Sequence, residues 1–243
     1  MKRMHLAAGL ALTACFVSTR SAEADCFPKV ALPTLPETAA TPQGFVPPGW
    51  HMLAQGSQDL NGDGSPDLVM VLRDTDQKNV VVIPPNDACD GVVDAPPVDT
   101  NPYLLVVAFA NPGGKGYHRV LQNGTFIPRD AKSEADPNFD GVTVRHGSFS
   151  VRLNSLTNSD INLIYTFRFQ HDRFELIGYD ENTVQRTSGE IDDTSANLST
   201  GRVKHSTGTI SSDKLKDSWT TLKAPKTPSI EEIGEADSYT LPD

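Results

Sequence analysis

The sequence predicts an all-β protein, a single domain of mostly antiparallel sheet with few or no long helices. Three observations predict this class. The apolar residues fall in short runs or alternate with polar residues, as strands require. Glycine and proline contribute 18 residues each, so turns are frequent. No segment of helical length carries an apolar face with a period of 3.6 residues.

The length of 243 residues fits one large domain. Composition divides the chain into a signal peptide (1–24), a Pro-rich extended arm (25–48), a β domain (49–206) and a polar C-terminal extension (207–243). No tandem repeat is visible. These boundaries leave the β domain as the part that carries the core.

The first residues have the features of an export signal. Lys2 and Arg3 precede a short apolar run at 6–17, and Ala22 and Ala24 form an A-x-A site that predicts cleavage after Ala24. We therefore expect a periplasmic or secreted bacterial protein.

A second cleavage site overlaps the first, because residues 12–15 resemble a lipobox whose Cys15 would carry lipid. Phe16 and Val17 continue the apolar run where lipoproteins usually turn polar or small, so the plain signal peptide is preferred. No later segment approaches the roughly 20 apolar residues of a membrane span.

Two cysteines, Cys26 and Cys89, remain after cleavage. In an exported protein such a pair predicts one disulfide, which would tie the arm to the loop after the first strands. The alternative is two free thiols.

Charge narrows the class of partner. The net charge is −10, and loss of 1–24 removes three cations (Lys2, Arg3, Arg20) and one anion (Glu23), which gives −12. Such a surface repels nucleic acid and anionic lipid, and it suits cations or a basic protein.

The first half of the β domain contains four apolar segments that we expect to be strands. The run at 104–108 is continuously apolar, which is typical of a strand buried on both faces. The four segments are 50–54, 67–72, 79–83 and 104–108.

In the second half of the β domain, apolar and polar residues alternate more clearly. Phe149, Val151 and Leu153 share one face of a strand. Segments 161–169 and 173–179 form a hairpin around Gln170, His171 and Asp172. One face of the hairpin carries Tyr165, Phe167 and Phe169 on the first strand, opposite Phe174, Leu176 and Gly178 on the second. This alternation predicts that the face is part of the hydrophobic core, and the alternative is a ligand groove.

Toward the C-terminus the chain becomes more polar and its apolar segments become shorter. Further short strands are expected at 189–197 and 201–205. Segment 215–222 fits either a short amphipathic helix or a strand around Trp219. Residues 223–243 are rich in proline and acids and predict a partly ordered tail.

One segment carries recognisable chemistry. Calcium needs six to eight oxygen ligands, and a short loop supplies them when alternate residues point inward. The loop at 59–67 has this pattern, and Gly64 at position 6 permits the sharp turn. The predicted ligands are Asp59, Asn61, Asp63, the Ser65 carbonyl and Asp67. The alternative is a polar turn whose side chains cap their own backbone.

Position 12 of the loop is Met70, where an EF-hand has glutamate, and strands rather than helices flank it. The loop resembles the calcium loops of FG-GAP or VCBS-like repeats, in which D-x-N-x-D-G-x-x-D leads directly into an apolar strand. The match covers only 49–74, in one full copy. The resemblance therefore implies a calcium-bound β-hairpin and not a propeller.

A partial second copy begins at Asp136 and continues through Asn138 and Asp140, but Val144 replaces its last carboxylate. It predicts either a weak second metal loop or, more simply, an acidic turn.

A looser resemblance extends over the rest of the chain. The segments NPYLLVV, GYHRVLQN, DPNFDGVTVRHGSFSV, YTFRFQHDRFELIGYD and LSTGRV resemble a group of bacterial exported proteins often labelled lipoproteins or VCBS-repeat-like proteins. This resemblance implies architecture and location, and it implies no activity.

Catalytic motifs are scarce: the sequence has no G-x-S-x-G, H-E-x-x-H or Walker loop, and its histidines have no close ligand spacing. We expect a non-catalytic, calcium-binding β module of the bacterial envelope. Two alternatives remain. One is an inhibitor or immunity protein that binds a basic enzyme or toxin. The other is a hydrolase with paired carboxylates, drawn from Asp130, Glu134, Glu175, Asp180 and Glu181.

Overall fold

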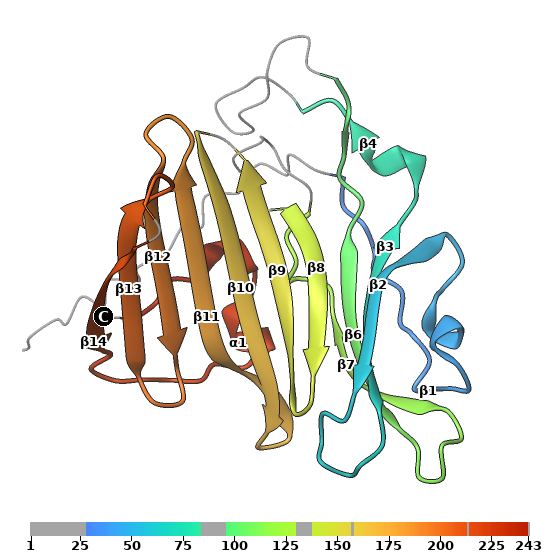
Figure 1. Ribbon diagram of the computed structural model, residues 1–243. Helices are drawn as coiled ribbons and strands as arrows, with labels where there is room; N and C mark the ends of the chain where they lie inside the picture. Colours follow the sequence, from blue (N-terminus) through green and yellow to red (C-terminus); the bar gives the residue numbers. More distant parts are fainter. Residues whose placement is uncertain (1–27, 84–95, 130–137, 157, 213, 243) are drawn as a thin grey trace, which may run out of the picture.

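The computed structural model describes residues 28–83, 96–129, 138–156, 158–212 and 214–242 (Figure 1). Its regular secondary structure is mostly β, and every strand pair is antiparallel, which confirms the predicted class. The strands are β1 (Thr38–Ala39), β2 (Trp50–Gln58), β3 (Asp67–Asp74), β4 (Val80–Val81), β5 (Val98–Asp99), β6 (Tyr103–Ala110), β7 (Tyr117–Asn123), β8 (Asn138–Arg145), β9 (Ser148–Leu156), β10 (Ser159–Gln170), β11 (Arg173–Gln185), β12 (Glu190–Asn197), β13 (Arg202–Thr209) and β14 (Lys216–Thr221).

Four short helical elements complete the described chain: the 3₁₀ turns η1 (Pro42–Phe45), η2 (Gln77–Asn79) and η3 (Ala236–Ser238), and the helix α1 (Ile230–Ile233). No helix in the described part of the chain combines the length and the apolar character needed to cross a membrane.

The strands form two main sheets that lie side by side (Figure 1). One has five strands in the order β1-β7-β6-β3-β2, and the other has seven in the order β14-β13-β12-β11-β10-β9-β8. The β4–β5 pair stands apart as a small ladder. The predicted segments 50–54, 67–72, 104–108, 161–169 and 173–179 lie inside longer strands. Segments 189–197 and 201–205 each begin one residue before β12 and β13, and in 79–83 only Val80–Val81 is extended, after η2.

The five-stranded sheet is buried on both faces in its centre. All eight residues of β6 are buried, as its continuous apolar run predicts. The inner-face residues join the main core, whereas Leu104 and Val106 belong to a second, outer cluster. Leu35 and Phe45 from the Pro-rich arm cover that outer cluster, so the arm replaces the second layer that this face would otherwise need.

The seven-stranded sheet buries one face, which is rich in aromatic residues. Phe149, Val151 and Leu153 lie on this face with an exposure of at most 1%, as predicted. The β10–β11 hairpin closes through His171 and Asp172, whose φ angles are 53° and 59°, values typical of a two-residue turn.

One detail of the hairpin differs from the prediction. A register shift between Thr166 and Phe167 changes the alternation on β11. Tyr165 therefore pairs with Tyr179 rather than with a glycine, and Gly178 pairs with Thr166 on the outer face. A β-bulge of this kind adds one residue to one strand, which strict alternation does not anticipate.

The C-terminal segment is part of the core. Segment 215–222 contains β14, the edge strand of the seven-stranded sheet, so the strand rather than the helix expected for this segment is present. Ile230 and Ala236 have an exposure of 0% within the main cluster, and the Tyr165 hydroxyl donates to the Ala236 carbonyl at 2.6 Å. A capping box starts α1, in which Ser229 and Glu232 each accept from the other's backbone N–H. The prediction of a partly ordered tail underestimated this packing.

Candidate metal loop and outer groove

The predicted calcium loop connects β2 to β3 at the lower end of both sheets in Figure 1. Gly62 and Gly64 both have φ of 84°, a left-handed conformation that favours glycine. The sharp turn expected at Gly64 is therefore present, and Gly62 provides another.

The polar side chains of the loop fold back on the loop's own backbone. Asp59 accepts from the N–H groups of Gly62 and Gly64 at 2.7 and 3.0 Å. Asn61 accepts from the N–H of Asp63 at 2.9 Å. Asp63 accepts from the N–H of Ser65 at 2.7 Å, a hydrogen bond that lowers the pKa of Asp63. Asp59, Asn61 and Asp63 are thus gathered in one turn.

Asp67 has a different environment. It is completely buried, and its two carboxylate oxygens accept from the N–H of Leu60 and the N–H of Ala110, both at 2.9 Å. Burial raises the pKa of Asp67 against the opposite effect of these two hydrogen bonds. Asp67 therefore holds the end of the loop against β6.

The loop also contacts the other sheet. The N–H of Gly147, in the β8–β9 turn, donates to the Asp59 carbonyl at 2.7 Å. The neighbouring His146 Nδ1 lies 3.9 Å from Asp59 Oδ2. Leu60 is buried in the main core. The loop consequently joins β2 and β3 to β6 and to the β8–β9 turn.

Within the described ranges, no three His, Cys, Asp or Glu side chains are grouped so that they would hold one ion. In the possible second loop, Asn138 and Asp140 lie in β8, and Asp140 pairs with Arg152. Asp136 lies outside the described residues, as do the predicted signal peptide and the expected disulfide cysteines, Cys26 and Cys89.

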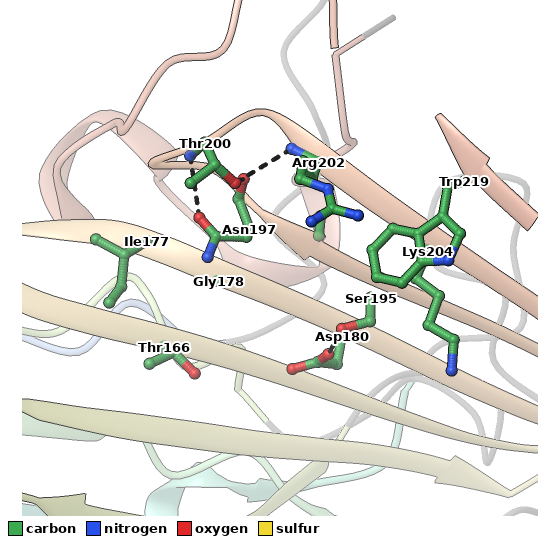
Figure 2. Close-up of a pocket in the computed structure, with 11 residues that line it drawn as sticks. Thr166, Ile177, Gly178, Asp180, Ser195, Asn197, Thr200, Arg202, Lys204 and Trp219 are labelled. Carbon is green, nitrogen blue, oxygen red and sulfur yellow. Dashed lines mark hydrogen bonds between the residues drawn. The ribbon is translucent and has the colours of Figure 1, made fainter. Parts of the chain in front are cut away.

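A groove of about 480 Å³ lies on the outer face of the seven-stranded sheet, and sequence reasoning did not find it (Figure 2). Small and polar residues, including Gly178, Asp180 and Ser195, line its floor, and Figure 2 shows Trp219, Arg202 and Lys204 gathered at one side. The only sequence signal was a tryptophan in an otherwise polar strand, with 56% of its surface exposed.

The acids considered for a hydrolase occupy separate places. Glu175 is buried at the turn end of the β10–β11 hairpin, Asp180 lines the outer groove, and Glu181 accepts from the Tyr179 hydroxyl beside a smaller inner pocket. Asp130 and Glu134 lie outside the described residues.

No family model, curated protein or solved structure matches the chain. A function can therefore be inferred only from the loop and the groove themselves.

Proposed function

We propose that the protein is an exported, non-catalytic β module whose scaffold is stabilised by calcium bound in the 59–67 loop. The observation that carries the proposal is the gathering of Asp59, Asn61 and Asp63 in one tight turn, with their oxygens directed inward onto the loop backbone. A carboxylate oxygen that accepts one N–H keeps further acceptor capacity, so these hydrogen bonds leave room for a hard cation.

The proposed ligands are the side-chain oxygens of Asp59, Asn61 and Asp63 and the backbone carbonyl of Ser65, with water completing the shell. Asp67 is assigned a positioning role, since both of its oxygens bind backbone N–H groups. This set contains two carboxylates, one amide oxygen and one backbone carbonyl.

Calcium at this position would stabilise more than a hairpin. The loop is tied to β6 through Ala110 and to the β8–β9 turn through Gly147. An ion that binds the folded loop and not the unfolded chain would therefore hold the two sheets in their native arrangement.

Thermal unfolding in calcium and in chelator tests the proposal. At a calcium concentration about 100 times the dissociation constant, binding adds about 2.7 kcal/mol to the free energy of unfolding. For a domain of this size that corresponds to a rise of about 5–10 °C in Tm. Equal melting temperatures in the two conditions would contradict the proposal.

A second proposal, an inhibitor or immunity protein for a basic enzyme or toxin, is supported by the net charge of −10. Electrostatic steering would make association with such a partner fall steeply as salt is raised. An affinity for a basic enzyme that does not change with ionic strength would contradict this second proposal.

A further inference from the structure

We propose that the outer groove binds a saccharide that carries carboxylate groups, such as a chain of uronic acids. The proposal goes beyond the calcium module, because the groove belongs to the seven-stranded sheet and contains no residue of the 59–67 loop. Its volume of about 480 Å³ lies within the roughly 300–1,000 Å³ typical of ligand sites.

The aromatic wall supplies the first part of the argument. Trp219 lies on the edge strand β14 and exposes 56% of its surface, which is unusual for so large an apolar side chain. The Arg202 guanidinium stacks on the indole with its central carbon 4.4 Å from the ring centroid. Because Arg202 covers one ring face, the other face of the exposed indole is the surface that would stack on the C–H face of a sugar ring.

The floor supplies the second part. Gly178 carries no side chain, and a Cβ there would lie 3.4 Å from the Thr166 Cβ, so the floor is low at this point. Around it stand short polar groups: the Ser195 hydroxyl, which donates to Asp180, and Asn197, whose Oδ1 accepts from the N–H of Thr200 (Figure 2). Such groups match the hydroxyls at the edge of a sugar ring.

Charge selects the type of saccharide. Arg202 and Lys204 line the groove with Asp180, whereas the whole chain has a net charge of −10. Lys204 pairs with Asp217 at 2.9 Å, so the binding of an anionic ligand falls to Arg202. The planar guanidinium of Arg202 is suited to bidentate binding of a carboxylate. The acidity of the rest of the molecule disfavours long polyanions, nucleic acid among them, so a short uronate oligomer is the ligand expected.

The test is calorimetric titration of the wild-type protein with oligomers of galacturonate, mannuronate and glucuronate. Chelator is present throughout, so that calcium cannot bridge the uronates and the result is independent of the calcium loop. A neutral gluco-oligosaccharide and an oligothymidylate serve as comparison ligands. We expect binding of at least one uronate, and a shift and quenching of the fluorescence of the exposed Trp219 as it is covered.

Two substitutions and one matched control locate the site. Trp219→Ala and Arg202→Gln are expected to raise the dissociation constant about tenfold each. Arg145→Gln removes an exposed cation from β8, at the opposite edge of the same sheet, and is expected to leave it unchanged. Circular dichroism verifies folding, and the fluorescence of the wild-type protein gives a readout that needs no variant.

Several results would overturn the proposal. They are failure of all three uronates to bind, equal or tighter binding of the neutral saccharide or the oligothymidylate, and equal losses in Arg145→Gln and Arg202→Gln. The last result would indicate general charge attraction rather than a site.

Discussion

The Asp67 carboxylate accepts a hydrogen bond from the backbone N–H of Ala110 at 2.9 Å, across 43 residues of sequence. Its other oxygen accepts from the N–H of Leu60, inside the predicted calcium loop. A single buried side chain therefore connects the start of the loop to the end of β6. The loop is consequently tied to β6 of the five-stranded sheet, and the hydrogen bond from Gly147 to the Asp59 carbonyl ties it to the other sheet.

Asp67→Asn is expected to destabilise the protein by about 1–3 kcal/mol, because the amide nitrogen of asparagine would face one of the two N–H donors and leave it unsatisfied. Urea unfolding in chelator measures the loss without any contribution from metal. The control is Asp172→Asn, which removes an equivalent charge from an exposed turn residue and is expected to change stability by less than about 0.5 kcal/mol. Similar effects for the two variants would contradict the role given to Asp67.

The C-terminal segment is expected to contribute to global stability. Ile230→Ala removes a fully buried side chain and should cost about 2–5 kcal/mol. Ile210→Ala is the matched control, since Ile210 is 70% exposed and its loss should cost less than about 0.5 kcal/mol. A melting temperature for Ile230→Ala equal to that of the control would show that the packing of the C-terminal segment does not contribute to global stability.

The environment of Glu175 predicts how the stability of the fold depends on pH. Burial raises the pKa of Glu175, but hydrogen bonds from Gln170, Thr227, Arg173 and His171 outweigh burial and lower it to about 2. Because the folded state holds this carboxylate ionised more strongly than the unfolded state, its contribution is present above the ordinary pKa of 4.5 and is lost as pH falls toward 2.

Glu175→Gln should therefore be less stable than the wild type by about 1–3 kcal/mol at pH 7, and the difference should shrink as pH falls below about 4. Denaturant unfolding at pH 7, 4 and 3 measures this difference. A gap that stays constant across the three pH values would mean that the charge of Glu175 does not stabilise the fold.

The expected disulfide between Cys26 and Cys89 remains a prediction. Alkylation of the unfolded mature protein without reductant should modify neither cysteine, and alkylation after reduction should modify both. Modification of both cysteines in an unreduced sample purified from an oxidising compartment would show that they are free thiols.

Much of the fold could be predicted from the sequence because strand patterning is local. The alternation at Phe149, Val151 and Leu153 and the continuous run of β6 each follow from the burial of one or two faces. The packing of the C-terminal segment could not be predicted, because Ile230 and Ala236 are single apolar residues in a polar stretch and their partners are distant in sequence. The pairing of Tyr165 with Tyr179 depends on a bulge, for which the sequence carries no clear signal.

The candidate sites also contain some features that the sequence predicts and others that it does not. The 59–67 loop is a contiguous motif, so its sharp turn at Gly64 was predictable, whereas the left-handed conformation of Gly62 was not predicted. The buried role of Asp67 was not, because its partner Ala110 lies on another strand. The outer groove gathers residues from β10 to β14, and only the register of those strands brings Trp219 beside Lys204 and Arg202.

Calorimetric titration of calcium into chelator-stripped protein tests the central claim most directly, with Asp63→Asn as the paired variant. Asparagine keeps the oxygen that accepts from the N–H of Ser65 but removes the charge, so the turn should survive while metal affinity falls. We expect one calcium ion per wild-type chain and at least a tenfold weaker affinity in the variant. Absence of calcium uptake by the wild type, or equal affinity in both proteins, would contradict the account.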